Sequence, residues 1–229
     1  MWTLCRLVVL LFLVRSASGQ EVDAGISISY LPIITFQADG VSTTESVRNR
    51  LFPGVSVRAA FSRRIVFGLR FSRLVGTISN YESDDGTFAQ RHRIRSWFVE
   101  SSGQYKVLSQ GGLSLLIGAT GGLVHVVDGY DLLLEVRNTS GSTTDDVAYR
   151  YPRAGFTVGP HVELHVDLGA RTVLRWQTGL RYTRVRFPQR MGSIIIDNDN
   201  GLVVDRPQIG RTILMNGVNT TLGLSFRVQ

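Results

Sequence analysis

Apolar and polar residues alternate with a period of two over most of this chain, most clearly across residues 155–182. One face carries Phe156, Val158, Pro160, Val162, Leu164 and Val166, and the other carries Thr157, Gly159, His161, Glu163, His165 and Asp167. After a tight turn at 167–170, Leu174, Trp176, Thr178, Leu180 and Tyr182 oppose Arg175, Gln177, Gly179, Arg181 and Thr183. This period predicts a β-hairpin with one apolar and one polar face. Each strand also has the roughly 9–11 residues that a tilted strand needs to cross a bilayer.

The same pattern predicts six more strands, at 25–37, 54–61, 65–72, 96–107, 113–123 and 218–229. Pro32 weakens the first, because proline removes a donor from the hydrogen-bond ladder. Short turns at 62–64, 109–111 and 167–170 alternate with longer connections at 38–50, 80–92 and 128–153, and with one that reaches Leu214. Outer-membrane barrels show this alternation, with brief turns on one side of the membrane and long loops on the other.

The even strand number and a last strand that runs to the C-terminus in LSFRVQ make residues 22–229 similar to a known family. They resemble the small eight-stranded outer-membrane barrels of Gram-negative bacteria, of the OmpA membrane-domain and OmpX type. In that family Phe usually stands last, whereas Phe226 here lies three positions from the end. The resemblance implies an all-β, eight-stranded antiparallel up-and-down transmembrane β-barrel with short periplasmic turns and long extracellular loops. It rests on pattern rather than on a motif, and it implies a monomer without a cofactor.

The N-terminal residues predict a secretory signal peptide at 1–19, followed by the barrel at 20–229. Arg6 gives the positive start, residues 7–14 the apolar core and Ala17-Ser18-Gly19 the cleavage site. A membrane-anchoring helix would need about 20 apolar residues, and Arg15 closes the run after eight. The only cysteine, Cys5, lies in this segment, so the mature chain has no thiol for a disulfide or a metal. We therefore expect export through the inner membrane and residence in the outer membrane.

The charged residues indicate which face lies inside the barrel. A soluble ligand-carrying barrel of the lipocalin kind needs an apolar lumen, and a membrane barrel needs the reverse. The less apolar strand face carries Arg58, Arg70, Glu100, Lys106, His161, Glu163, Arg175, Arg181 and Arg227. An eight-stranded lumen is just wide enough for side chains to fill. The pattern therefore predicts a membrane barrel with a plugged lumen. A narrow or gated channel through exchangeable Arg–Glu pairs is the alternative.

The basic residues are almost all arginine, since Lys106 is the sole lysine, and the formal net charge is +7. A basic balance can indicate nucleic acid, but export and strand architecture favour membrane lipid. Arginines gather where strands meet the long connections, at Arg91, Arg93, Arg95, Arg150, Arg153, Arg184 and Arg186. Guanidinium groups bind phosphates through paired hydrogen bonds, so this rim predicts contact with lipopolysaccharide. A solvated rim without a ligand is the alternative.

Three patterns suggest chemistry, and each has a structural explanation. His161, Glu163 and His165 have the spacing of a metal or acid–base cluster, but their register points them into the lumen. His125 and Asp128 invite comparison with lipid A-modifying barrel enzymes, although no serine follows on the same face. Residues 197–201, DNDNG, resemble a calcium loop but place Ile196 at its first ligand position, so a turn is favoured. We expect no catalytic residue, metal or cofactor, and a lipid A-modifying enzyme remains an alternative.

The two longest connections, 128–153 and 191–207, predict hairpins that extend the sheet above the membrane. Asn200-Gly201 is a strong hairpin-turn signal. The segments on either side are too short to span, which favours eight strands over ten. Ile194, Ile195, Ile196, Leu202, Val203 and Val204 would form an apolar edge able to pair with a partner strand. We therefore expect a non-enzymatic structural or surface-interaction protein, whose loops bind an extracellular protein partner.

Overall fold

The computed structural model describes residues 21–31, 34–38, 41–45, 51–82, 88–138, 141–188, 190–195, 203–208 and 211–228. The expected signal segment, residues 1–19, lies outside this part of the chain. The described residues include no helix with the length and apolar character needed to cross a bilayer.

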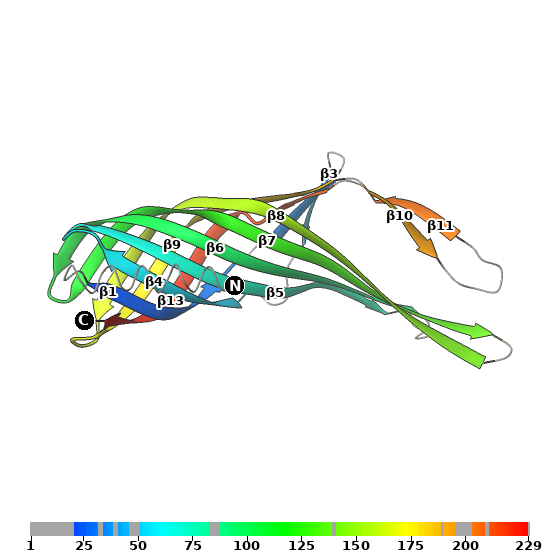
Figure 1. The fold of residues 1–229 in the computed structure, drawn as a ribbon, viewed down its shortest axis with the longest axis horizontal. Coiled ribbons are helices and arrows are strands. Elements are labelled where there is room, and N and C mark those ends of the chain that lie inside the picture. Colours follow the sequence, from blue (N-terminus) through cyan, green and yellow to red (C-terminus); the bar gives the residue numbers. More distant parts are fainter. Residues whose placement is uncertain are drawn as a thin grey trace.

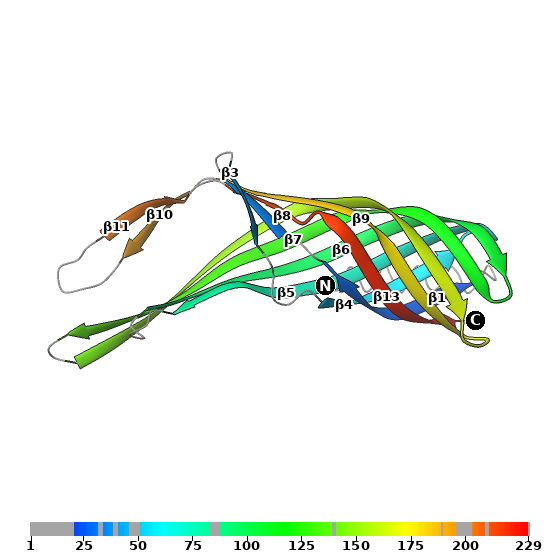
Figure 2. The same cartoon turned by 180° about the vertical axis from the view of Figure 1, so that it is seen from behind.

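Eight antiparallel strands close into one barrel, as the sequence predicts (Figures 1 and 2). In order around the wall they are β1 (Val22–Tyr30), β4 (Leu51–Ala60), β5 (Ile65–Glu82), β6 (Phe88–Gln110), β7 (Leu113–Asn138), β8 (Gly141–Asp167), β9 (Thr172–Phe187) and β13 (Gly217–Val228). Pairing of β13 with both β9 and β1 closes the wall, so the first and last strands lie side by side. The predicted fold class is confirmed.

The strands are strongly staggered. Following paired residues once around the wall from Glu21, beside Ala60, leads to the level of Leu31, ten residues further along the same segment. In a barrel, stagger and strand number together set the tilt and the width. The interior is therefore narrow enough for facing side chains to meet across it.

The prediction of one strand over 25–37 is wrong. β1 ends at Tyr30, and β2 (Ile34–Ala38) is a separate strand that pairs with β12 (Arg211–Leu214) and β3 (Val41–Glu45). The side chain of Leu31 keeps the inward phase of Ser27 and Ser29 and is buried in an apolar cluster inside the barrel. Pro32, which has no backbone N–H for the ladder, follows directly in the sequence. Strands β3 and β12 occupy stretches that the sequence marked as connections.

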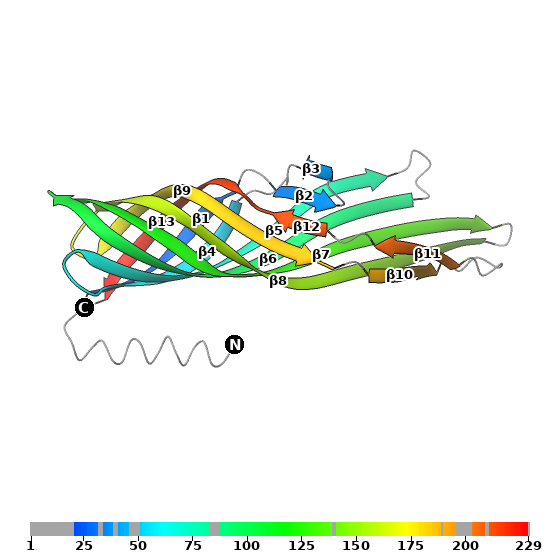
Figure 3. The same cartoon turned by 90° about the horizontal axis from the view of Figure 1, so that it is seen from above.

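Two other expected connections are largely strand. β5 and β6 continue to Glu82 and from Phe88, and β7 and β8 run to Asn138 and from Gly141 without interruption. These four strands project far past the barrel (Figure 3), which confirms the predicted hairpin over 128–153. A second, separate hairpin of β10 (Arg190–Ile195) and β11 (Val203–Gln208) confirms the one predicted over 191–207.

The opposite end of the barrel has tight turns. Gly111 and Gly112 join β6 to β7 with φ angles of +59° and +82°, the conformation that a two-residue hairpin turn requires and that glycine adopts without strain. At the β4–β5 turn, Ser62 Oγ accepts a hydrogen bond from the backbone N–H of Ile65 at 3.0 Å. The short turns therefore gather at this end of the barrel, and the long strands project from the other.

Apolar side chains on the barrel exterior are exposed, as a membrane barrel requires. Leu123 is 69 % exposed, Leu180 61 % and Phe67 53 %. On β6 the outward apolar positions extend from Trp97 to Val107, which at the usual rise and tilt spans about 25 Å, the height of a lipid-facing band. A soluble barrel would leave such a band in water, so the predicted orientation of the two faces is confirmed.

Glycines on the inner face provide space for the large polar side chains. Arg58 lies directly opposite Gly68, Gln104 opposite Gly118, and Glu100 opposite Gly122, each on the neighbouring strand. Arg175 likewise lies opposite Gly223, and His161 lies between Gly118 and Gly179. A side chain added at Gly122 would meet the carbonyl oxygen of Val99 and, at 2.7 Å, the Cα atom of Glu100.

The two adjacent glycines of β7 therefore give a matched test. We expect Gly122→Ala to destabilise the barrel by about 1–3 kcal/mol, because an added methyl group overpacks the contact with Val99 and Glu100. Gly121→Ala should be neutral or slightly stabilising, since its added methyl group would find no atom within 4 Å. Urea unfolding of both variants in detergent micelles measures the difference. Equal stability of the two variants would contradict the packing argument.

Candidate functional site: the barrel lumen and its outer rim

The lumen contains ionised side chains that are almost completely buried. Arg58, Glu100, Glu163, Arg175 and Arg181 are each 7 % exposed or less. They come from β4, β6, β8 and β9, and alternation along each strand turns them inward. Isolated charges in such a place would be strongly destabilising. Their partners therefore decide whether the barrel can fold.

Glu163 is the centre of the lower group of contacts, nearer the short turns. Its Oε1 accepts hydrogen bonds from Arg58 Nη1 at 2.7 Å and from His165 Nε2 at 2.8 Å. Its Oε2 accepts one from Gln104 Nε2 at 2.5 Å, and Arg58 Nη2 also donates to Gln104. His161 contacts the same Gln104 at 2.8 Å. These contacts explain the inward His and Glu residues of β8 as one closed network.

Glu100 is the centre of a second group higher in the lumen. Its Oε2 accepts hydrogen bonds from Arg70 Nε at 2.9 Å and Nη2 at 2.7 Å, and its Oε1 accepts one from Arg181 Nη2 at 2.5 Å. One carboxylate thus holds two guanidinium groups. Loss of a buried ion-pair partner typically costs about 3–5 kcal/mol. Glu100 is therefore the residue on which the upper network most depends.

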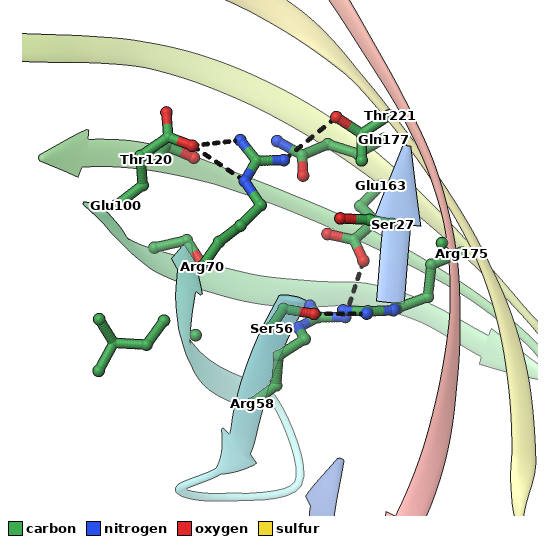
Figure 4. A pocket seen from close by; sticks show the side chains of 14 residues that line it. Ser27, Ser56, Arg58, Arg70, Glu100, Thr120, Glu163, Arg175, Gln177 and Thr221 are labelled. Carbon is green, nitrogen blue, oxygen red and sulfur yellow. Dashed lines mark hydrogen bonds and ion pairs between the residues drawn. The ribbon is translucent and has the colours of Figure 1, made fainter. Parts of the chain in front are cut away.

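Arg175 is bound differently. Its Nη2 donates to Ser56 Oγ at 2.8 Å, and no carboxylate within the described ranges forms an ion pair with it. It lines a cavity of about 40 Å³ with Arg58, Arg70, Glu100 and Glu163 (Figure 4). The charge network predicted from the sequence is therefore uneven, with one arginine on a hydroxyl group instead of a carboxylate.

The two remaining predicted lumen residues lie at the short-turn end. Arg227 bridges Glu21 at 2.6 Å and Asp167 at 2.5 Å, and its side chain is 27 % exposed. Lys106 occupies an inward position that is only partly buried. Both lie at the mouth of the lumen and outside the central network.

The loop end of the lumen is apolar, which sequence reasoning missed. A buried cluster there consists of Leu31, Phe52, Leu74, Ile94, Phe98, Val124, Val126, Val185, Phe187, Ile213 and Met215. Phe52 and Phe98 stack with ring centroids 5.8 Å apart. The guanidinium group of Arg181 lies 4.8 Å from the ring centroid of Phe98, so a cation–π contact joins the charged and apolar layers.

At the same level the exterior changes from apolar to basic. Arg73 on β5, Arg95 on β6, and Arg184 and Arg186 on β9 lie just beyond the lipid-facing positions, toward the loop end, and all four are exposed. The guanidinium group of Arg73 lies 4.5 Å from the ring centroid of Trp97, which itself stacks on Phe71 at 5.2 Å. Alternating pairs such as Arg184-Val185-Arg186-Phe187 carried the signal in the sequence.

The other predicted rim arginines have mixed positions. Arg150 is exposed on β8, and Arg93 is partly buried on the outward side of β6. Arg153 has the inward phase of β8, like Tyr151, and its Nη1 donates to the carbonyl of Pro152 at 2.9 Å. Arg91 lies in β6 beside Asp131 of β7 in the backbone register. The rim is therefore formed by outward positions of several strands, and Arg153 is not one of them.

The predicted loop edge is the β10–β11 hairpin. Ile194 pairs with Val204 and Ile195 with Val203, so the apolar segments pair with each other. Ile196 and Leu202 lie outside the described residues. The hairpin forms a two-stranded sheet, separate from the barrel sheet within the described part of the chain.

The described residues assemble neither a metal site nor the His–Asp arrangement of a lipid A-modifying enzyme. Within the described ranges, no group of three or more His, Cys, Asp and Glu side chains could hold a metal ion. His125 is exposed on the outside of β7, whereas Asp128 is buried on its inner side. The two side chains that invited comparison with lipid A-modifying enzymes therefore lie on opposite faces of one strand.

Comparison with protein-family models and with curated proteins found no match. Among solved structures, the chain is similar to a major outer membrane protein from Thermus thermophilus, with 12 % identity over 91 % of this chain and 99 % of that one and a TM-score of 0.47. It is also similar to Ail of Yersinia pestis, crystallised with the heparin analogue sucrose octasulfate (9 %, 91 % and 99 %, 0.43), and to Neisserial surface protein A (12 %, 91 % and 97 %, 0.41).

These identities and TM-scores are too low to support an argument about function. The strand order, closure and lipid-facing exterior described above establish the fold on their own. By that architecture the chain is a small eight-stranded antiparallel β-barrel with a lipid-facing exterior, the fold that the outer-membrane barrels of the OmpA membrane-domain and OmpX type also have.

Proposed function

We propose that this protein is a closed, non-enzymatic barrel of the outer membrane that acts through the surface it holds above the lipid. The reversal of polarity along the strands carries the proposal. Within the lipid band the inside is charged and the outside apolar, and beyond Trp97 the inside holds an apolar cluster beside the buried Asp128 while the outside is basic. Such a structure has a charged interior where it crosses the lipid and an apolar interior above it, and its longest strands project beyond the barrel.

Two consecutive layers close the lumen. The charged layer around Glu100 and Glu163 is tied by hydrogen bonds of 2.5–2.9 Å. Above it, the cluster around Phe52 and Phe98 fills the barrel with apolar side chains. An apolar constriction resists ions because it gives them nothing to replace their hydration. A gated channel that opened by exchanging Arg–Glu pairs would still meet this second layer.

Planar-bilayer recording tests closure. We expect no steady conductance steps from the purified protein and none from Glu100→Ala, because the apolar cluster remains when the upper ion pairs are lost. A folded control is needed, since an unfolded variant is also silent, and heat-dependent mobility in gels supplies it. Steady steps from the wild type would contradict closure, and steps from folded Glu100→Ala alone would favour the gated channel.

The outer rim fits lipopolysaccharide. Arg95, Arg184 and Arg186 are exposed immediately beyond the apolar band, at the level where the phosphates of an outer-leaflet lipid lie. Guanidinium groups pair with phosphate oxygens through two parallel hydrogen bonds and stay ionised at all physiological pH values. Membrane lipid and lipopolysaccharide are therefore the partners that this surface favours.

Lipopolysaccharide should raise the unfolding temperature of the wild-type protein in detergent, and much less that of an Arg95→Ala/Arg184→Ala/Arg186→Ala variant. Binding to the folded state alone stabilises it by an amount that grows with the ratio of ligand concentration to Kd. The matched control replaces three exposed arginines at the short-turn end, Arg63, Arg64 and Arg171, which should leave the lipopolysaccharide effect intact. An equal loss of the lipopolysaccharide effect in both variants would show that the effect depends only on total charge, and would contradict a binding site at the rim.

A protein partner on the β10–β11 hairpin is the second candidate function. The hairpin is a two-stranded sheet whose outer edges carry ladder groups, the feature used when a partner strand adds to a sheet.

Deleting residues 192–206 should abolish attachment of cells displaying the protein to its target surface without changing the heat-dependent mobility of the barrel. Deleting residues 132–147 at the β7–β8 tip is the control. Attachment that survives the first deletion would exclude the β10–β11 hairpin as the contact.

A further inference from the structure

The cavity in the middle of the lumen has an unusual charge distribution. Three arginines, Arg58, Arg70 and Arg175, and two carboxylates, Glu100 and Glu163, line its 40 Å³ (Figure 4). Arg181, also buried, adds a fourth guanidinium group just above. The carboxylates are therefore outnumbered, and the question is which arginine lacks a counter-charge.

Both carboxylates are already committed. The oxygens of Glu163 accept from Arg58, His165 and Gln104, and those of Glu100 accept from Arg70 and Arg181. Their oxygens therefore form ion pairs with guanidinium groups other than that of Arg175.

Arg175 is left with one neutral partner. Its Nη2 donates to Ser56 Oγ, while its Nε lacks any hydrogen-bond partner in the described part of the chain. Ser27 Oγ, which lines the same cavity, is also buried without a partner there. Figure 4 shows Arg175 and Arg58 converging beside Ser56, so two like charges approach each other. A buried charge without compensation is strongly destabilising.

One other carboxylate comes near this region. Asp23 lies on the inner face of β1, and its Oδ1 is buried without a hydrogen bond in the described structure. No ion pair between Asp23 and Arg175 is formed, although both residues are described. Asp23 is thus the rival source of the missing negative charge, and a test must separate it from a bound ion.

We propose that this cavity binds one small monovalent anion of the size of chloride. One uncompensated guanidinium group sets the charge, and Arg175 Nε with the hydroxyl groups of Ser27 and Ser56 supplies the donors. The volume sets the size, since 40 Å³ holds roughly three water molecules. A halide ion fits this volume. The inference stands apart from the proposed surface function, because it concerns only the lumen.

Unfolding in detergent micelles, with chloride, bromide or gluconate at equal ionic strength, tests the site. Gluconate is too large for the cavity and serves as the inert anion. Chloride and bromide should stabilise the wild type relative to gluconate. Above the Kd, the ratio of folded to unfolded protein should rise about tenfold for each tenfold rise in chloride. Equal stability in chloride and gluconate would overturn the proposal.

Arg175→Gln removes the uncompensated charge. It should abolish the halide effect, and in gluconate it should be at least as stable as the wild type. Arg227→Gln at the mouth of the lumen is the matched control and should keep the full effect. If Asp23 supplies the counter-charge instead, the wild type shows no halide effect and Asp23→Asn gains one. A folded Arg175→Gln that keeps the halide effect would also overturn the site.

Chloride NMR of the wild type keeps the proposal testable should Arg175→Gln fail to fold. Folded protein in micelles should broaden the chloride NMR line more than empty micelles do. Added bromide should reverse this broadening, and gluconate should not. Absence of this excess broadening would overturn the site without recourse to any variant.

Discussion

The narrow interior of an eight-stranded barrel imposes the main constraint on this protein. Every inward side chain must fit among the others, and every inward charge must find a partner there. Glu100 and Glu163 satisfy four arginine and histidine contacts between them, all within 3 Å. Glycines on the neighbouring strands give these long side chains their space. Charge pairing and backbone packing thus act together, because the glycines let the paired side chains of Glu100 and Glu163 reach their partners inside the barrel.

The same strands serve in two solvents. In lipid the outer face must be apolar, and in water it must be polar while the inside supplies the core. Immediately beyond Trp97 the strands exchange the two requirements because residue types change while the alternation continues, and the register shift between Thr77 and Ser79 of β5 comes only further out. The cation–π contact between Arg181 and Phe98 lies where the two interiors meet. The strands are continuous, and they enclose a charged interior in the membrane and an apolar interior above it. Together these features explain how β5 to β8 can extend so far beyond the membrane.

This arrangement places the surfaces that can interact with the surroundings on the exterior. In the proposed function, interaction with the surroundings falls to the arginine rim, which would meet lipid phosphates, and to the β10–β11 hairpin, which presents backbone edges. The unequal charge inside the lumen is a separate matter. Three arginines and two carboxylates around one small cavity leave a positive charge that the protein's own ion pairs do not neutralise.

The sequence determined what depends on alternation and local turn chemistry. It predicted the eight barrel strands, the short turns such as that at Gly111-Gly112, the lipid-facing side and the inward position of Arg58, Glu100 and Glu163, because a period of two assigns each residue to a face. Tertiary structure decided what depends on contacts across the barrel. β1 ends at Tyr30 and β2 pairs with β12 instead, Glu100 takes two arginines while Arg175 takes a serine, and inward residues such as Phe52 and Phe98 meet to form an apolar core. No spacing along one strand encodes these partners, since stagger and closure bring them together from strands far apart in the chain.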